Sequence, residues 1–324
     1  STRQPAQPQP QPQPQPPHTP PAMTQEALSS WPSGDGTTAG CGHAIHAQVY
    51  DAWPWTRVLY TKWELEFDGI AASAAAGEHY LWLMAVFIPG YLLAIVIGKA
   101  IMANRSPFSL KTALIAWNAG LALFSAIGAA RLLPHLAMMI SHRGLYFAVC
   151  AEPKNSYGLG ASGLWTFFFI YSKIPELVDT AFIILRKKKL LFLHYYHHCT
   201  VLAYCLHSYA TTAAPGLWFA SLNLFVHAIM YSYYALAAAG HRPSWAIAVT
   251  ILQIVQMVVG MSLAAAVAYF WSLNKPCHQA PSNMIAGLAM YASYFVLFFI
   301  FFLHRYVTGG SSSKEKPSVK PKAE

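Results

Sequence analysis

Charged side chains are scarce in this sequence. Only 10% of its 324 residues are Asp, Glu, Lys or Arg, whereas 55% are hydrophobic, and ordinary soluble domains carry about 25% charged residues. This composition predicts an integral membrane protein. The net charge of +9 is not gathered into a basic stripe, so the basic residues are interpreted as topology and lipid-headgroup signals, and nucleic acid is not an expected partner.

The first residues also lack the sequence pattern of a signal peptide. No basic segment precedes a short apolar stretch there, so we expect no cleavable leader. Residues 1–45 are rich in Pro and Gln and cannot bury a core, which predicts a disordered tail, partly in polyproline II conformation. Residues 46–79 are aromatic and of mixed charge. Their indoles, Trp53, Trp55 and Trp63, favour an amphipathic segment that lies at the non-cytosolic membrane interface.

Seven apolar runs occupy residues 80–306, each close to the ~20 residues that a membrane-spanning helix needs. Lys and Arg concentrate in alternate loops and in the basic tail, 307–324. The positive-inside rule then places the C-terminus in the cytosol and the N-terminus across the membrane. The predicted fold class is an all-α integral membrane protein with seven transmembrane helices. Their expected bounds are 80–102, 110–133, 162–185, 190–210, 216–238, 244–272 and 284–306.

Three histidines, His194, His197 and His198, form the pattern H-x-x-H-H at the cytosolic end of the fourth run. Positions i, i+3 and i+4 of a helix share one face, so the three imidazoles should project together. Ionisable side chains within a membrane are costly and usually face the protein interior, where they mark functional sites. We therefore expect the chemistry of the protein to lie at this face.

Polar residues on four of the predicted helices fall at a similar depth. With a rise of ~1.5 Å per residue, His197 lies about 10 Å from the cytosolic end of its helix, Asp179 about 9 Å and His227 about 16 Å. A single buried polar residue is commonly a helix–helix contact, but this many at matching depth predict one polar chamber that opens to the cytosol. The other members of this layer are Lys173, Glu176, Asn223, Gln253 and Gln256.

The histidine box allows a metal-dependent and a metal-free interpretation. Membrane di-iron desaturases and hydroxylases also carry H-x-x-H-H, but they need several histidine boxes, and no second cluster occurs within the apolar runs. A single zinc ion bound by His194, His198 and His227 is a second metal-dependent alternative. The metal-free interpretation uses imidazole as a nucleophile or general base, with Glu176 or Asp179 to orient it.

At these residues the sequence resembles the ELO family, the endoplasmic-reticulum elongases of very-long-chain fatty acids. The resemblance covers about residues 80–306, and the Pro/Gln-rich tail departs from the family pattern. Four spaced motifs in the same order carry it. They are K-x-x-E-x-x-D-T at 173–180, H-x-x-H-H at 194–198, N-x-x-x-H-x-x-M-Y-x-Y-Y at 223–234 and T-x-x-Q-x-x-Q at 250–256.

The resemblance implies 3-ketoacyl-CoA synthesis, in which an acyl-CoA condenses with malonyl-CoA and releases CO2 and CoA, without a further cofactor. It also implies a ring of six helices, spans two to seven, around an acyl tunnel. The acyl group is expected on His197, with His194, His198 and His227 as the other catalytic residues. The expected supporting layer is Lys173, Glu176, Asp179, Asn223, Tyr231, Gln253 and Gln256, and the amides among them would serve the thioester oxygen. The residues expected to bind CoA phosphates are Lys187, Lys188, Lys189 and Arg242.

Further expectations concern covalent links, location and partners. Cys150 and Cys277 fall in two loops on the non-cytosolic side, where they could pair in an oxidising lumen, and the resemblance includes cysteines at both places. The ending with Lys320 and Lys322 resembles a dilysine retrieval signal of the endoplasmic reticulum. The residues around the motifs favour the branch that acts on saturated and monounsaturated chains. Expected partners are membrane lipid and the ketoacyl-CoA reductase, dehydratase and enoyl reductase of the elongation cycle, with a homodimer as a further option.

Overall fold

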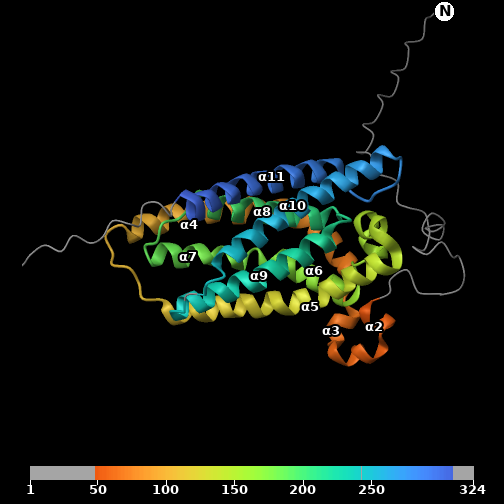
Figure 1. Cartoon of the computed structure of the whole chain (residues 1–324), viewed down its shortest axis with the longest axis horizontal. Helices are drawn as coiled ribbons and strands as arrows, with labels where there is room; N and C mark the ends of the chain where they lie inside the picture. Colours follow the sequence, from red (N-terminus) through yellow and green to blue (C-terminus); the bar gives the residue numbers. More distant parts are fainter. Residues whose placement is uncertain (1–47, 242, 309–324) are drawn as a thin grey trace, which may run out of the picture.

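The computed structural model describes residues 48–241 and 243–308, and across them the chain is helical. No sheet occurs in this part of the chain, which contains one isolated β-bridge between Asp68 and Leu159. The Pro/Gln-rich tail, Arg242 and the two lysines of the proposed retrieval signal lie outside the described residues. The long helices run side by side along the longest axis of the molecule (Figure 1). The all-α prediction is therefore confirmed for the described residues.

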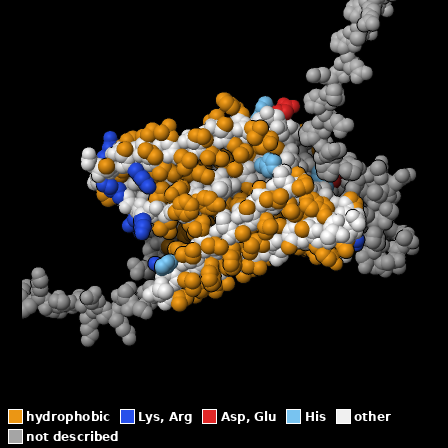
Figure 2. All heavy atoms as spheres, turned by 90° about the horizontal axis from the view of Figure 1, so that it is seen from above, with side chains coloured by type: hydrophobic (Ala, Val, Ile, Leu, Met, Phe, Trp, Pro, Cys, Tyr) orange, Lys and Arg blue, Asp and Glu red, His pale blue; other side chains and the backbone are white. Residues whose placement is uncertain are grey.

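Five helices in the described ranges are long and apolar enough to cross a membrane. They correspond to the first, second, fifth, sixth and seventh predicted spans, and they make the chain a multi-pass membrane protein. The structure gives them as α4 (Gly69–Met102), α5 (Lys111–Cys150), α9 (Gly216–Ala239), α10 (Ala246–Ser272) and α11 (Pro281–Phe302), which a π-helical segment, η4 (Leu303–Thr308), continues. Hydrophobic side chains cover these helices, and most of the visible Lys and Arg side chains gather at one end (Figure 2).

The third and fourth predicted spans do not appear as single long apolar helices. The third is divided into α6 (Gly160–Ser172), the 3-10 turn η3 (Pro175–Leu177) and α7 (Val178–Leu185). Pro175 explains the division, because proline lacks the amide N–H that would continue the hydrogen bonding of the helix. The fourth span is α8 (Phe192–Ala210), which is long enough, but its histidines and tyrosines lower its hydropathy.

Two helices extend past their predicted bounds at the same end of the bundle. The α4 helix begins at Gly69, where Asp68 caps it by accepting hydrogen bonds from the amides of the first turn. The α5 helix continues through Pro134 to Cys150 and changes direction at Gly144, whose φ of 80° suits glycine. Half of the α5 residues that follow Pro134 are buried. They form a cap at the end of the bundle opposite the α7–α8 connection (Figure 1).

A disulfide joins this cap to the connection between α10 and α11. It links Cys150, the last residue of α5, to Cys277. The amide of His278 also donates to the Cys150 carbonyl at 2.9 Å. Helix pairs α5–α9, α10–α11 and α4–α8 make the most extensive contacts in the bundle. The cross-link therefore connects two of these three pairs.

We expect peptide mapping without reductant to recover Cys150 and Cys277 as one cross-linked fragment. Replacing both residues with serine should destabilise the protein by about 2–5 kcal/mol, because a link over this long a loop restricts the unfolded chain. The measurement is the thermal unfolding temperature in detergent. Reductant should lower that temperature in the wild type and leave the double variant unchanged. Two free thiols in the mapping experiment would contradict the link.

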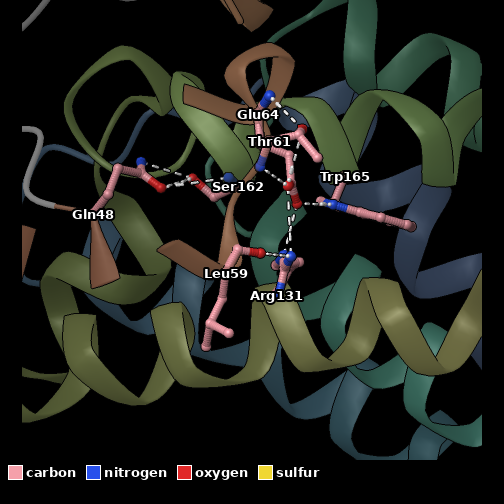
Figure 3. Close-up of polar contacts among 7 residues, drawn as sticks. All are labelled: Gln48, Leu59, Thr61, Glu64, Arg131, Ser162 and Trp165. Carbon is pink, nitrogen blue, oxygen red and sulfur yellow. Dashed lines mark hydrogen bonds and ion pairs between the residues drawn. The ribbon is translucent and has the colours of Figure 1, made fainter. Parts of the chain in front are cut away.

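Residues 48–66 form three short segments that pack against the bundle. They are α2 (Val49–Ala52), η1 (Pro54–Leu59) and α3 (Lys62–Glu66). Glu64 of α3 is buried, and its Oε1 accepts hydrogen bonds from Arg131 Nε at 2.6 Å and Trp165 Nε1 at 2.8 Å. Arg131 also donates through Nη2 to the Leu59 carbonyl at 2.6 Å (Figure 3). One carboxylate thus fastens the segment to both α5 and α6.

The Glu64 contact should make docking of this segment depend on pH. Burial acts to raise the pKa of Glu64, but hydrogen bonds from Arg131, the Thr61 backbone and Trp165 outweigh it, so the pKa lies below its ordinary value. The charged form therefore stabilises the docked segment above the unfolded-state pKa of about 4.3, and this contribution is lost as pH falls through the lowered pKa. We expect hydrogen-exchange protection of residues 48–66 to persist at mildly acidic pH and to fall only below that range.

A matched pair of variants tests the same contact at neutral pH. Glu64→Gln should reduce the exchange protection of residues 48–66, because the amide cannot replace a carboxylate paired with Arg131. Glu66→Gln is the control, since Glu66 lies on the same helix but makes only an exposed pair with Lys62 at 3.9 Å. Equal protection in the two variants would show that the Glu64 charge does not hold the segment.

Candidate active site

A cavity of about 320 Å³ lies among α7, α8, α9, α10 and α11. It is lined by polar residues that the depth argument placed in one layer and by the aromatic and apolar side chains between them. The predicted site residues that line it are Glu176, Asp179, His194, His197, His198, Asn223, His227, Tyr231, Gln253 and Gln256. The structure therefore brings four sequence motifs, which are far apart in the chain, to one chamber.

The histidine box presents its three rings to the cavity from one face of α8. The ring centroids of His194 and His198 are 4.5 Å apart, and those of His197 and His198 are 5.5 Å apart. His194 is held by a 2.9 Å hydrogen bond between its Nε2 and Thr180 Oγ1. The His197 ring packs 5.0 Å from the Tyr294 ring, but within the described ranges its nitrogens make no hydrogen bond. The nitrogens of His198 also make no hydrogen bond within these ranges, so His197 and His198, unlike His194, both present unbonded rings to the cavity.

A buried ion pair lies beside the histidines. Lys173 and Glu176 are 1% and 3% exposed, and their Nζ and Oε1 atoms are 2.7 Å apart. The 3-10 turn at Pro175 lets both side chains point inward from a short stretch of chain. Lys173 Nζ also donates to Asn223 Oδ1 at 3.1 Å. Because each charge has a partner, the pair can exist within the bundle.

The same contacts determine which nitrogen of His227 carries its proton. Asn223 Oδ1 accepts from Lys173, so its Nδ2 group faces His227 Nε2, at 3.3 Å, as a donor. Nε2 is then the unprotonated acceptor, and the proton lies on Nδ1. That atom is 4.0 Å from Glu176 Oε1. The chain from Lys173 through Asn223 therefore holds His227 neutral, in one orientation and one tautomer.

Asp179 has a different environment on α7. Its Oδ1 accepts from Trp117 Nε1 at 2.5 Å, and its Oδ2 accepts from Tyr231 OH at 2.8 Å. Trp117 comes from α5, so this carboxylate ties α5, α7 and α9 together. Among the predicted amides, Gln253 Nε2 contacts Met230 Sδ at 3.2 Å, and Gln256 is buried at the cavity wall. These amides can supply neutral donors to a substrate oxygen.

The predicted phosphate-binding cations are spread more widely than the sequence indicated. Lys187 turns back to donate to the carbonyls of Ala103 and Arg105 at 3.0 and 2.8 Å, so it is engaged in the first loop. Lys188 lines a second cavity of about 410 Å³, together with Arg186. Lys189 is exposed and lines neither cavity, and Arg242 lies outside the described residues.

Several residues of the site were missed by sequence reasoning. Arg305 lines the first cavity and Arg186 the second, and each is a basic residue at the end of an apolar run, a position interpreted from the sequence as a topology signal only. Tyr91 donates to or accepts from Thr180 Oγ1 at 2.7 Å and so supports the His194 contact. Trp117 has no sequence signal, because a tryptophan within an apolar run is ordinary.

The zinc alternative has no ligand set in the described ranges. Within them, no group of three or more His, Cys, Asp or Glu side chains has an arrangement that could hold a metal ion. His194 and His198 are neighbours, but His227 is directed to Asn223 and Glu176. The residues present therefore do not fit a three-histidine zinc centre.

Clustered imidazoles, carboxylates and amides inside a helical membrane bundle define the class of a multi-pass membrane enzyme. Residues 77–314 match the GNS1/SUR4 family, ELO, which is more than half of the chain. Very long chain fatty acid elongase 6 of Gallus gallus is 44% identical over 237 residues, 72% of this chain and 84% of that protein. The human protein of the same name is 42% identical over 227 residues, 69% and 82% of the two chains. The Drosophila melanogaster protein of the same name is 40% identical over 242 residues, which cover 73% of this chain and 76% of that protein.

The chain therefore belongs to the ELO family. It is a very-long-chain fatty acid elongase, the 3-ketoacyl-CoA synthase that performs the condensing step of elongation. The family resemblance predicted from the four motifs is confirmed, and the desaturase or hydroxylase interpretation of the histidine box is wrong.

Proposed function

We propose that the enzyme condenses acyl-CoA with malonyl-CoA in two half-reactions and that His197 carries the acyl group between them. The observation that supports this most is the His197 ring, which lines the cavity with its nitrogens unbonded to protein. In the first half-reaction an imidazole nitrogen attacks the thioester carbonyl. The C–S bond breaks, the CoA thiolate takes up the imidazole proton, and an acyl-imidazole remains.

In the second half-reaction malonyl-CoA loses CO2, and the electron pair of the broken C–C bond forms an enolate. The enolate carbon attacks the acyl carbonyl, the C–N bond to His197 breaks to release 3-oxoacyl-CoA, and the departing ring nitrogen takes a proton from water to regenerate the imidazole. His227 lines the same cavity, and its Nδ1–H, which is 4.0 Å from Glu176 Oε1 and so not hydrogen-bonded to it, can donate to the enolate oxygen. Gln253 and Gln256 supply neutral donors for the other thioester oxygen, and Asn223 positions His227 rather than contacting substrate.

The acyl tail would extend from this chamber toward the cap. A narrow space of about 40 Å³ shares Asn223 with the main cavity and is lined mainly by aromatic and aliphatic side chains, among them Phe169, Val201, Phe219 and Met290. An apolar lining suits a hydrocarbon chain. We propose that the tunnel follows this path inside a ring of six spans, formed by α5, α6 with α7, α8, α9, α10 and α11.

With α6–α7 and α8 as the third and fourth crossings, the protein has seven spans, an N-terminus in the lumen and a C-terminus in the cytosol of the endoplasmic reticulum. The gathering of basic side chains at one end of the bundle and the Cys150–Cys277 disulfide at the other support this orientation. At the basic end, Arg186, Lys188 and Arg305 are the cavity-lining cations available to CoA phosphates. The other enzymes of the elongation cycle are proposed partners, and a second copy of the chain is a further one.

The test is a product assay with purified protein, malonyl-CoA and a panel of acyl-CoAs. We expect saturated and monounsaturated substrates to be lengthened by two carbons as 3-oxoacyl-CoA, in keeping with the residues around the motifs. With acyl-CoA alone, intact-mass spectrometry should detect an enzyme adduct of one acyl group together with one equivalent of released CoA. Condensation without any adduct or early CoA release would refute the acyl-enzyme route.

A further inference from the structure

The outer face of residues 48–66 exposes large apolar side chains. Trp55, Val58 and Trp63 are 74%, 85% and 80% exposed, and Trp53 and Leu59 are 43% and 60% exposed. In contrast, Tyr50 and Glu64 are buried against the bundle. An exposed aromatic and aliphatic patch of this kind usually marks a surface that meets a lipid or protein partner.

Contacts on the inner face hold the segment in one orientation. Gln48 Nε2 donates to Ser162 Oγ at 2.9 Å and to the Leu159 carbonyl at 3.0 Å, both at the start of α6. At the other end, Glu64 binds Arg131 and Trp165 (Figure 3). Because both ends are attached, the exposed indoles cannot rotate toward the bundle without breaking these contacts.

The depth of the attachment point matches the edge of the hydrocarbon layer. Arg131 follows Lys111, the first residue of α5, by a rise of about 30 Å at ~1.5 Å per residue, which equals the usual hydrocarbon thickness of about 30 Å. On α4 the exposed Glu78 and His79 lie a similar distance before Lys99. Two helices therefore place the boundary at the level of Arg131.

The direction of the segment agrees with this position. In Figure 1, α2 and α3 project sideways from the end of the bundle that carries the cap, across the direction of the long helices. If those helices cross the bilayer, the segment lies along its surface. Its charges are mixed, with Arg57 and Lys62 against three acidic residues, so it has no cationic face for anionic lipid. Indole rings prefer the headgroup region of a bilayer.

We propose that residues 48–66 form an interfacial foot, in which Trp53, Trp55, Val58, Leu59 and Trp63 insert into the headgroup and acyl boundary of the lumenal leaflet. The occupant of this face is zwitterionic lipid, bound by apolar insertion. Through Glu64, the foot holds the lumenal halves of α5 and α6 at a fixed height in the membrane. This inference does not depend on the acyl-enzyme route.

The experiment uses the full chain in phosphatidylcholine nanodiscs, with Cys41→Ser as the parent and its background labelling subtracted. A nitroxide is attached in Val58→Cys, with Glu66→Cys as the matched position on the charged side of the same segment. Collisions with oxygen, which partitions into lipid, and with a water-soluble nickel chelate are measured. We expect the oxygen-to-nickel ratio to be at least several-fold higher at 58 than at 66, and unchanged when anionic lipid is added.

Each other outcome overturns the proposal. Equal ratios at 58 and 66 would place the patch in water. Shielding of position 58 from both reagents, or spin–spin broadening there, would assign the face to another protein surface. A ratio that rises only with anionic lipid would replace apolar insertion by charge attraction. With Glu64→Gln added, the label at 58 should become mobile. An unchanged spectrum would show that the Glu64 contacts do not couple the foot to the bundle.

Discussion

His197→Ala is expected to abolish condensation while the protein still folds. The variant removes a cavity-lining ring whose nitrogens make no hydrogen bond to the described residues, so little structure depends on it. Loss of a nucleophile that carries a covalent intermediate should lower kcat by at least ~10³-fold. The acyl adduct and the early release of CoA should disappear together with the product. The measurement is turnover by mass spectrometry, alongside size-exclusion chromatography to verify folding.

His207→Ala is the matched control. His207 lies on the same helix, α8, but near the cap end, where its ring packs 5.7 Å from the Tyr80 ring and lines none of the cavities around the histidine box. This variant should retain turnover and the adduct. Wild-type-like activity of His197→Ala would transfer the nucleophile role to another residue, and an adduct that persists in that variant would identify His194, His198 or His227 by peptide mapping.

His227→Ala should separate the two half-reactions. If His227 serves the enolate, its loss should spare the release of CoA from acyl-CoA and suppress product formation. The stalled adduct would then accumulate on His197.

The site was predictable from the sequence because helical periodicity and rise determine both the face and the depth of a residue. These two quantities placed His194, His197, Asn223 and Gln256 in one layer, and all four line one cavity. The number of membrane-spanning helices was harder to predict from the sequence. An apolar run of sufficient length does not reveal that Pro175 interrupts the helix within it.

Long-range side-chain partners were also beyond the reach of the sequence. Trp117 reaches Asp179 across 62 positions, and Arg131 reaches Glu64 across 67. Periodicity describes one helix at a time and carries no information on which helix will lie opposite. Likewise, Lys187 belongs to a basic run that suits phosphate, but its Nζ atom satisfies two loop carbonyls because the chain reverses direction there.

The second prediction with a large expected effect concerns the buried Lys173–Glu176 ion pair beside the histidines. Glu176→Gln is expected to destabilise the fold by about 3–5 kcal/mol, because it leaves Lys173 as a buried cation whose remaining partner is the neutral Asn223. Lys173→Met alone should have a similar cost by leaving the carboxylate unpaired. The measurement is the thermal unfolding of purified protein in detergent.

The double variant Lys173→Met, Glu176→Gln distinguishes folding from chemistry. With both charges removed, no buried charge lacks a partner, so most of the lost stability should return, with a coupling of about 1–3 kcal/mol between the two sites. Activity should stay low, because Asn223 then loses the donor that orients it, and His227 Nδ1 loses the carboxylate 4.0 Å away. A double variant that is stable and fully active would mean that the pair serves the fold alone, whereas strictly additive losses would mean that Lys173 and Glu176 do not stabilise each other.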